Sequence, residues 1–160
     1  MLHFAYGSNM SRPLMRGRCP TATALGTARL PGWRFVVTRD GYASIVPAPG
    51  AQVHGVLWRL CPRDLAALNA YESLDSGLYS RRVLAVRWNG RRAAALTYLA
   101  RARVQGRPRP GYQEIIVAAA RDWRLPDRYI EVLEQWVASG LRAARPAETG
   151  EIGWAKESSA

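Results

Sequence analysis

Cysteine, lysine and long apolar runs are all scarce in this sequence. Thiols occur at Cys19 and Cys61 alone, and two isolated thiols without a disulfide framework are typical of a reducing compartment. No stretch approaches the roughly 18 apolar residues of a transmembrane helix, and the segment from Met1 to Tyr6 lacks the pattern of a signal peptide. We therefore expect a cytoplasmic protein with no membrane partner, in which both thiols are buried and unreactive.

The common cofactor and nucleophile motifs are missing as well. Neither a P-loop nor a Gly-x-Gly-x-x-Gly segment occurs, and His3 and His54 have no cysteine or carboxylate at metal-ligand spacing. The Gly-x-Ser-x-Gly elbow of serine hydrolases is also absent, and Ser8 has no evident base beside it. These absences argue against a nucleotide-binding protein, a zinc site and a catalytic triad, so we expect no cofactor and no metal.

The basic residues are almost entirely arginine. The net charge is +11, and all but one of the 23 basic residues are Arg, the exception being Lys156. They are scattered along the chain, whereas a nucleic-acid footprint needs basic residues clustered on one face. We expect no nucleic-acid partner, while an anionic small-molecule substrate is compatible with this charge.

At 160 residues the chain has the length of one domain that closes its own hydrophobic core. β-branched and aromatic residues dominate the first hundred positions, helical periodicity follows, and Asn89 with Gly90 is a strong hairpin signal. We expect strands at 2–6, 21–38, 42–46, 53–60, 83–88 and 93–100, with Pro47 to Gly50 as a loop. We expect helices from Ser11 to just before Gly17, at 63–71, at 112–123 and at 127–138, the last one ended by Gly140.

This order of elements indicates the α+β class, as a small and mainly antiparallel β-barrel or curled sheet with flanking helices. A doubly wound sheet does not fit, because the strands do not alternate with crossover helices. We place the folded domain at residues 1–139 and a polar, loosely held C-terminal tail at 140–160.

The turn formed by Tyr6, Gly7, Ser8 and Asn9 is the first candidate for chemistry. It stands between a strand and a helix start, where backbone N–H groups are free to point at one spot. Such a turn can form a concavity that binds a carboxylate or a developing oxyanion. Without further information, an ordinary turn in which Ser8 or Asn9 caps the helix is the more frequent arrangement.

Glu72 is the second candidate. It falls at the end of the helix expected at 63–71, where the helix dipole disfavours a negative charge. A raised pKa and an acid/base role would follow. A solvated surface glutamate is the simpler alternative.

Taken in order along the chain, these segments resemble the γ-glutamylcyclotransferase family with its AIG2-like relatives. The resemblance spans about residues 2–138. Its most specific part is Phe4 to Met10, which matches the family's Tyr-Gly-Ser-Asn signature, joined to Tyr71 and Glu72 downstream. Further matching segments are Val53–Trp58, Gly77–Tyr79, Thr97–Leu99, Pro110–Tyr112, Leu125–Pro126 and Tyr129.

The resemblance implies a small mixed β-barrel and a cofactor-independent enzyme. The implied reaction is intramolecular cyclisation of a γ-glutamyl group to 5-oxoproline, with release of an amino acid or amine and with Glu72 as general acid/base. The substrate is a small γ-glutamyl compound. The substrate-binding residues implied are the turn Tyr6, Gly7, Ser8, Asn9 and Met10, and the aromatic walls Tyr79, Tyr98 and Tyr112.

Two positions depart from the family pattern, which leaves the substrate open. Ser73 and Arg124 stand where many relatives have glycine. A γ-glutamylamine-specific cyclotransferase and a catalytically silent binding protein of the same fold are the alternatives. The glutathione-specific branch fits less well, because its signature resembles Tyr-Gly-Ser-Leu, whereas Asn9 follows Ser8 here.

Overall fold

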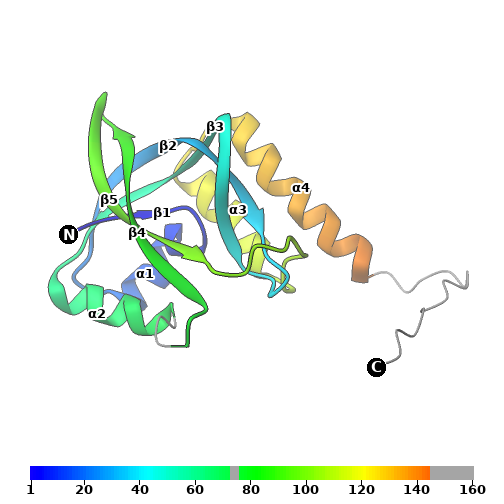
Figure 1. The fold of residues 1–160 in the computed structure, drawn as a ribbon, viewed down its shortest axis with the longest axis horizontal. Coiled ribbons are helices and arrows are strands. Elements are labelled where there is room, and N and C mark those ends of the chain that lie inside the picture. Colours follow the sequence, from blue (N-terminus) through cyan, green and yellow to red (C-terminus); the bar gives the residue numbers. More distant parts are fainter. Residues whose placement is uncertain (73–75, 145–160) are drawn as a thin grey trace, which may run out of the picture.

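The computed structural model describes residues 1–72 and 76–144, which form a closed β-barrel with helices packed outside it (Figure 1). The strand order around the barrel is β1-β3-β2-β4-β5. The strands are β1 (Leu2–Ala5), β2 (Thr23–Val37), β3 (Ala43–Arg59), β4 (Tyr79–Trp88) and β5 (Arg91–Ala100). The helices are η1 (Ser8–Met10), α1 (Arg12–Arg18), α2 (Pro62–Tyr71), α3 (Tyr112–Asp122) and α4 (Asp127–Ala144). The expected α+β barrel is confirmed.

The long antiparallel pair β2–β3 provides much of the barrel wall. The segment from Pro47 to Gly50, expected as a loop, instead belongs to β3, so that expectation was wrong. The pairing passes from Pro31 with Gln52 to Trp33 with Pro47, which is a register shift. An irregular stretch of this kind bends a strand and tolerates proline, because it interrupts the regular ladder of hydrogen bonds.

The hairpin β4–β5 is built as its sequence indicates. Asn89 and Gly90 both adopt positive φ angles, 47° and 72°. Two positive φ angles are the requirement of the tight turn whose twist matches that of antiparallel strands. The strands pair continuously from Trp88 with Arg91 to Tyr79 with Ala100.

The seam between β1 and β5 closes the barrel. It is parallel and has one backbone pair, His3 with Leu96. Two side chains reinforce it: His3 Nδ1 lies 3.0 Å from the Leu96 carbonyl oxygen, and the Tyr6 hydroxyl donates to the Tyr98 carbonyl oxygen over 2.5 Å. The seam therefore depends on side chains where backbone pairing is sparse.

Helices α1 and α2 begin at side-chain caps. The Ser11 hydroxyl accepts from the Leu14 N–H at the start of α1, which continues past Gly17 to Arg18 and so ends later than expected. The Cys61 sulfur caps α2 by accepting from the Asp64 N–H. Cys61 is half-buried, so the expectation of two buried thiols holds for Cys19 and was wrong for Cys61.

Helices α3 and α4 pack against each other on one side of the barrel (Figure 1). Helix α4 runs through Gly140 to Ala144, so the expected end at Gly140 was wrong. One glycine costs a helix interior only about 1 kcal/mol, and the residues that follow, Leu141 to Ala144, are good helix formers. The tail expected to be loosely held lies, from residue 145 onward, outside the described residues. None of the described helices is long and apolar enough to cross a membrane.

Candidate active site

The Tyr-Gly-Ser-Asn turn leads from the end of β1 into a single turn of 3-10 helix. The Met10 N–H donates to the Gly7 carbonyl oxygen and the Ser11 N–H to that of Ser8, each over 3.0 Å. Since the first N–H groups of a helical turn have no acceptor within it, those of Ser8 and Asn9 are not used by this turn. Both side chains are nevertheless buried, so the turn lines the interior of a site and not the outer surface.

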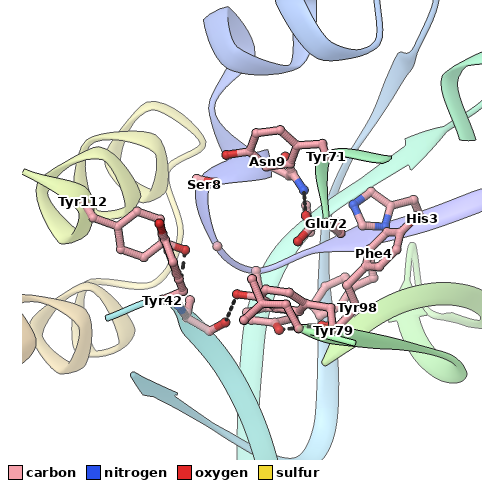
Figure 2. A pocket seen from close by; sticks show the side chains of 15 residues that line it. His3, Phe4, Ser8, Asn9, Tyr42, Tyr71, Glu72, Tyr79, Tyr98 and Tyr112 are labelled. Atoms are coloured by element: carbon pink, nitrogen blue, oxygen red, sulfur yellow. Dashed lines mark hydrogen bonds between the residues drawn. The ribbon is translucent and has the colours of Figure 1, made fainter. Parts of the chain in front are cut away.

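Glu72 meets this turn from the other side. It is the C-cap of α2, and its backbone N–H donates a hydrogen bond to the Leu68 carbonyl oxygen over 2.9 Å. Its Oε1 accepts a 2.8 Å hydrogen bond from Asn9 Nδ2 (Figure 2). Burial raises the pKa of Glu72 to about 6, while the Asn9 hydrogen bond and the charge of Arg18 oppose the rise. Desolvation is the chief cause of this rise, whereas the sequence had suggested the helix dipole.

A pocket of about 240 Å³ lies between these two segments. Tyr79, Tyr98 and Tyr112 line it, as does the turn from Tyr6 to Asn9. Met10 does not line it: its side chain is fully buried in the core, because the 3-10 turn rotates it away from the pocket. The remaining lining residues, which we did not expect, are His3, Phe4, Ala5, Tyr42, Ala43, Tyr71 and Leu78.

The tyrosine hydroxyls of the pocket are fixed by hydrogen bonds (Figure 2). Tyr79 donates to the Ala43 carbonyl oxygen over 3.0 Å, and the Ala43 N–H donates to the Tyr112 hydroxyl over 3.2 Å. Tyr98 donates to Asn69 Oδ1 over 2.6 Å. Burial raises the pKa of Tyr112 to about 12 and moves those of Tyr79 and Tyr98 upward as well. These phenols therefore stay protonated at neutral pH and offer shape and hydrogen bonds.

The two histidines have different positions relative to the pocket, which His3 lines. His3 is buried beside Tyr98, and burial lowers its pKa to about 4, so it is neutral at physiological pH. His54 lies outside the pocket, against Tyr129. Within residues 1–72 and 76–144, no group of three or more His, Cys, Asp or Glu side chains is arranged to hold a metal ion.

Of the two positions that depart from the family pattern, the structure describes one. Ser73 falls outside the described residues. Arg124 lies between α3 and α4 with a φ of 53°, in the left-handed region that glycine adopts most readily. It lines a separate surface hollow with His54, so it has no contact with the pocket of Glu72.

Arg18 is the residue at this site that sequence reasoning missed. From the last turn of α1 its guanidinium donates to Ser8 Oγ over 3.1 Å and to Asn9 Oδ1 over 2.6 Å. It also donates to the Tyr71 hydroxyl and lies 3.7 Å from the centre of that ring. Among so many arginines, nothing in the sequence distinguishes Arg18, because its role follows only from the approach of α1 to α2.

Comparison with known proteins identifies relatives over most of the chain. The family model described as gamma-glutamyl cyclotransferase, AIG2-like, matches residues 3–125. The chain is 30% identical to the gamma-glutamylcyclotransferases of Mus musculus and Homo sapiens, with 83% of this chain and 77% of each relative aligned. A solved gamma-glutamyl cyclotransferase structure superposes with a TM-score of 0.80 at 27% identity, covering 96% of this chain and 93% of that one.

Proposed function

Because the chain belongs to the AIG2-like γ-glutamyl cyclotransferase family, we propose that its pocket cyclises the γ-glutamyl group of a small substrate to 5-oxoproline. The observation that carries this proposal is the contact between Asn9 of the turn and the partly buried carboxylate of Glu72. It unites an anion-binding turn and a proton-transferring group around one cavity.

The turn holds the glutamyl end of the substrate. The N–H groups of Ser8 and Asn9, which the 3-10 turn leaves unused, are donors for the substrate's α-carboxylate or for the oxyanion that develops on the γ-carbonyl oxygen. Because Gly7 has no Cβ, Ala43 and Tyr112 of the pocket wall can lie close to this turn. A pocket of about 240 Å³ has room for about eight water molecules, which is the size class of one glutamyl group.

The reaction needs no nucleophile from the protein. The substrate's α-amine attacks its own γ-amide carbonyl carbon, so that a C–N bond closes the five-membered ring and the original γ-amide C–N bond breaks. Holding the two ends together gives an effective molarity that can lower the barrier by as much as about 7 to 11 kcal/mol. The side chains Tyr79, Tyr98 and Tyr112 keep bulk water from the bent substrate.

Glu72 moves the proton. It takes a proton from the substrate ammonium, which makes the amine nucleophilic, and returns a proton to the leaving nitrogen. An α-ammonium has a pKa of about 8, so an ordinary glutamate would lie nearly 4 units below it. With a pKa of about 6, Glu72 lies only about 2 units below, which makes the transfer from the ammonium less unfavourable.

The test is formation of 5-oxoproline from purified protein with a panel of γ-glutamyl amino acids and γ-glutamylamines. We expect turnover of at least one class, abolished by Glu72→Gln. Preference for amines would identify a γ-glutamylamine cyclotransferase. Binding of 5-oxoproline without turnover of any substrate in the panel would contradict the proposal and indicate a silent binding protein.

We expect no nucleic-acid partner, because the pocket is suited to a small molecule and the arginines are scattered through the sequence. A binding titration with duplex DNA and single-stranded RNA at physiological salt checks this. Tight binding with a steep dependence on salt concentration would contradict it.

A further inference from the structure

The Arg18 guanidinium joins three segments at one wall of the pocket. It extends from α1, contacts Ser8 and Asn9 of the turn, and contacts Tyr71 at the end of α2. Tyr71 is half-exposed and lines the pocket directly before Glu72. Arg18 itself does not line the pocket, so any effect on the reaction passes through the residues that it holds.

The contact between Arg18 and Asn9 determines which way the Asn9 amide points. A guanidinium has donors and no acceptor, so the Asn9 atom 2.6 Å from it must be the oxygen Oδ1. The amide nitrogen Nδ2 is then directed at Glu72 Oε1, 2.8 Å away, and donates to it. An ionised Glu72 carboxylate only accepts and therefore favours the same orientation, whereas a protonated carboxyl could also donate to the amide oxygen. Arg18 therefore keeps the amide in one orientation in both protonation states of Glu72.

The charge of Arg18 acts on Glu72 as well. No carboxylate forms a salt bridge with Arg18 among the residues that the structure describes, and its hydrogen-bond partners are two hydroxyls and an amide. The positive charge of Arg18 opposes the effect of burial on the Glu72 carboxylate and lowers its pKa. Arg18 thus influences both the orientation and the ionisation of the same group.

We propose that Arg18 is a positioning residue for the cyclisation: by holding the Asn9 amide and the Tyr71 hydroxyl, it fixes the Glu72 carboxylate against the pocket wall in one orientation. This inference rests on the proposed function of Glu72 as the proton-transferring group. It adds that the arrangement of Glu72 depends on a residue from a third segment, which touches neither the carboxylate nor the pocket.

Two substitutions separate the geometry from the charge. Arg18→Lys keeps the charge, but one ammonium cannot hold Ser8, Asn9 and Tyr71 together, so we expect kcat to fall about tenfold to 100-fold with an unshifted acid limb of the pH profile. Arg18→Gln loses both the geometry and the charge, so we expect a similar fall in kcat and an acid limb moved to higher pH. The matched control is Arg16→Gln, an exposed arginine of the same helix, which should change neither.

A double-mutant cycle tests the route through Asn9. If Arg18 acts by orienting that amide, Asn9→Ala combined with Arg18→Lys should lower kcat no further than Asn9→Ala alone. Additive losses would overturn the proposed route. Thermal unfolding of each variant shows whether a fall in kcat comes only from misfolding, since a folding defect removes active enzyme without moving the pH profile.

A measurement without turnover distinguishes failure of this inference from failure of the proposed function. The Glu72 carboxyl is titrated by carbon NMR in the unaltered protein and in Arg18→Gln, and its pKa should be higher in the variant. An unchanged pKa with an unchanged kcat would overturn the role of Arg18 even if Glu72→Gln is inactive. A raised pKa in a protein that turns over no γ-glutamyl substrate would instead overturn the proposed function.

Discussion

Asn9 donates its side-chain amide to the carboxylate of Glu72 over 2.8 Å, although 63 positions separate the two residues in the sequence. One comes from the turn that follows β1, and the other from the C-terminal end of α2. In the proposed reaction the turn supplies hydrogen-bond donors and the helix end supplies the base, so neither segment would be a site alone.

Replacing Glu72 by glutamine should remove turnover while leaving the fold and ligand binding largely intact. Glutamine keeps the shape and most of the hydrogen bonding but cannot carry a proton, so we expect kcat to fall by about 100-fold to 10,000-fold. The measurements are 5-oxoproline formation and calorimetric binding of 5-oxoproline. Activity within about twofold of the unaltered protein would exclude Glu72 as the proton shuttle.

The activity should fall in acid with the titration of Glu72. The carboxylate must be ionised to accept a proton, and its pKa is about 6. We therefore expect kcat/KM to decline below a midpoint near pH 6, instead of near the ordinary value of about 4.3 for glutamate. Steady-state rates between pH 4.5 and about 8 check this. A flat profile down to about pH 5 would mean that Glu72 is not the titrating base.

The same pKa predicts that Glu72 destabilises the fold at neutral pH. Its pKa is raised from 4.5 to about 6 on folding, so the folded state binds this proton more tightly. Protonation of Glu72 therefore adds about 2 kcal/mol to the free energy of unfolding. This contribution is fully present below pH 4.5 and is lost as pH rises through about 6. Glu72→Gln should therefore be more stable than the unaltered protein at pH 8 and equally stable near pH 4. Denaturant unfolding at both pH values measures this, and equal stability at pH 8 would contradict it.

Gly7→Ala should weaken substrate binding more than it weakens folding. A Cβ at position 7 would lie 3.3 Å from the Ala43 Cβ and 3.5 Å from the Tyr112 hydroxyl, so the pocket wall must shift slightly. We expect KM to rise several-fold and the free energy of unfolding to change by about 1 kcal/mol or less. The measurements are KM and denaturant unfolding, with Gly17→Ala as the control because a Cβ there meets nothing within 4 Å. Equal effects of the two substitutions on KM would argue against a ligand at the turn.

Chelators should leave the activity unchanged. The described residues contain no cluster of metal-ligating side chains, and the cyclisation as proposed uses the substrate's own amine. Assays after dialysis against a strong chelator check this. Activity lost on chelation and restored by a divalent ion would require a revised mechanism.

The sequence predicted the parts of the site that depend on local chemistry. The turn from Tyr6 to Asn9 and the position of Glu72 at a helix end both follow from patterns within a few residues. The family resemblance then supplied the expectation that they meet. The three tyrosines of the pocket were likewise found through the resemblance, because their periodicity alone fits core packing equally well.

The features that were missed depend on tertiary contacts. Met10 belongs to the signature but turns into the core, since the 3-10 geometry determines its direction and the sequence pattern does not. Pro47 to Gly50 have the composition of a loop, yet pairing with β2 on either side keeps them in a strand. Arg18 gives no signal among the many arginines, because its importance arises where α1 meets α2.

The seam between β1 and β5 is a place where the barrel can open locally. His3 and Tyr6 hold this seam with side chains where the backbone provides one pair, and both residues also line the pocket. Opening the seam breaks few hydrogen bonds, whereas separating β4 from β5 would break a complete ladder. Local fluctuations begin where the fewest bonds must break. The contact between β2 and β4 likewise has one backbone pair, Arg29 with Arg87, so the barrel has two such places and one of them lies beside the pocket. Amide exchange should therefore be faster at the β1–β5 seam than in the β4–β5 ladder.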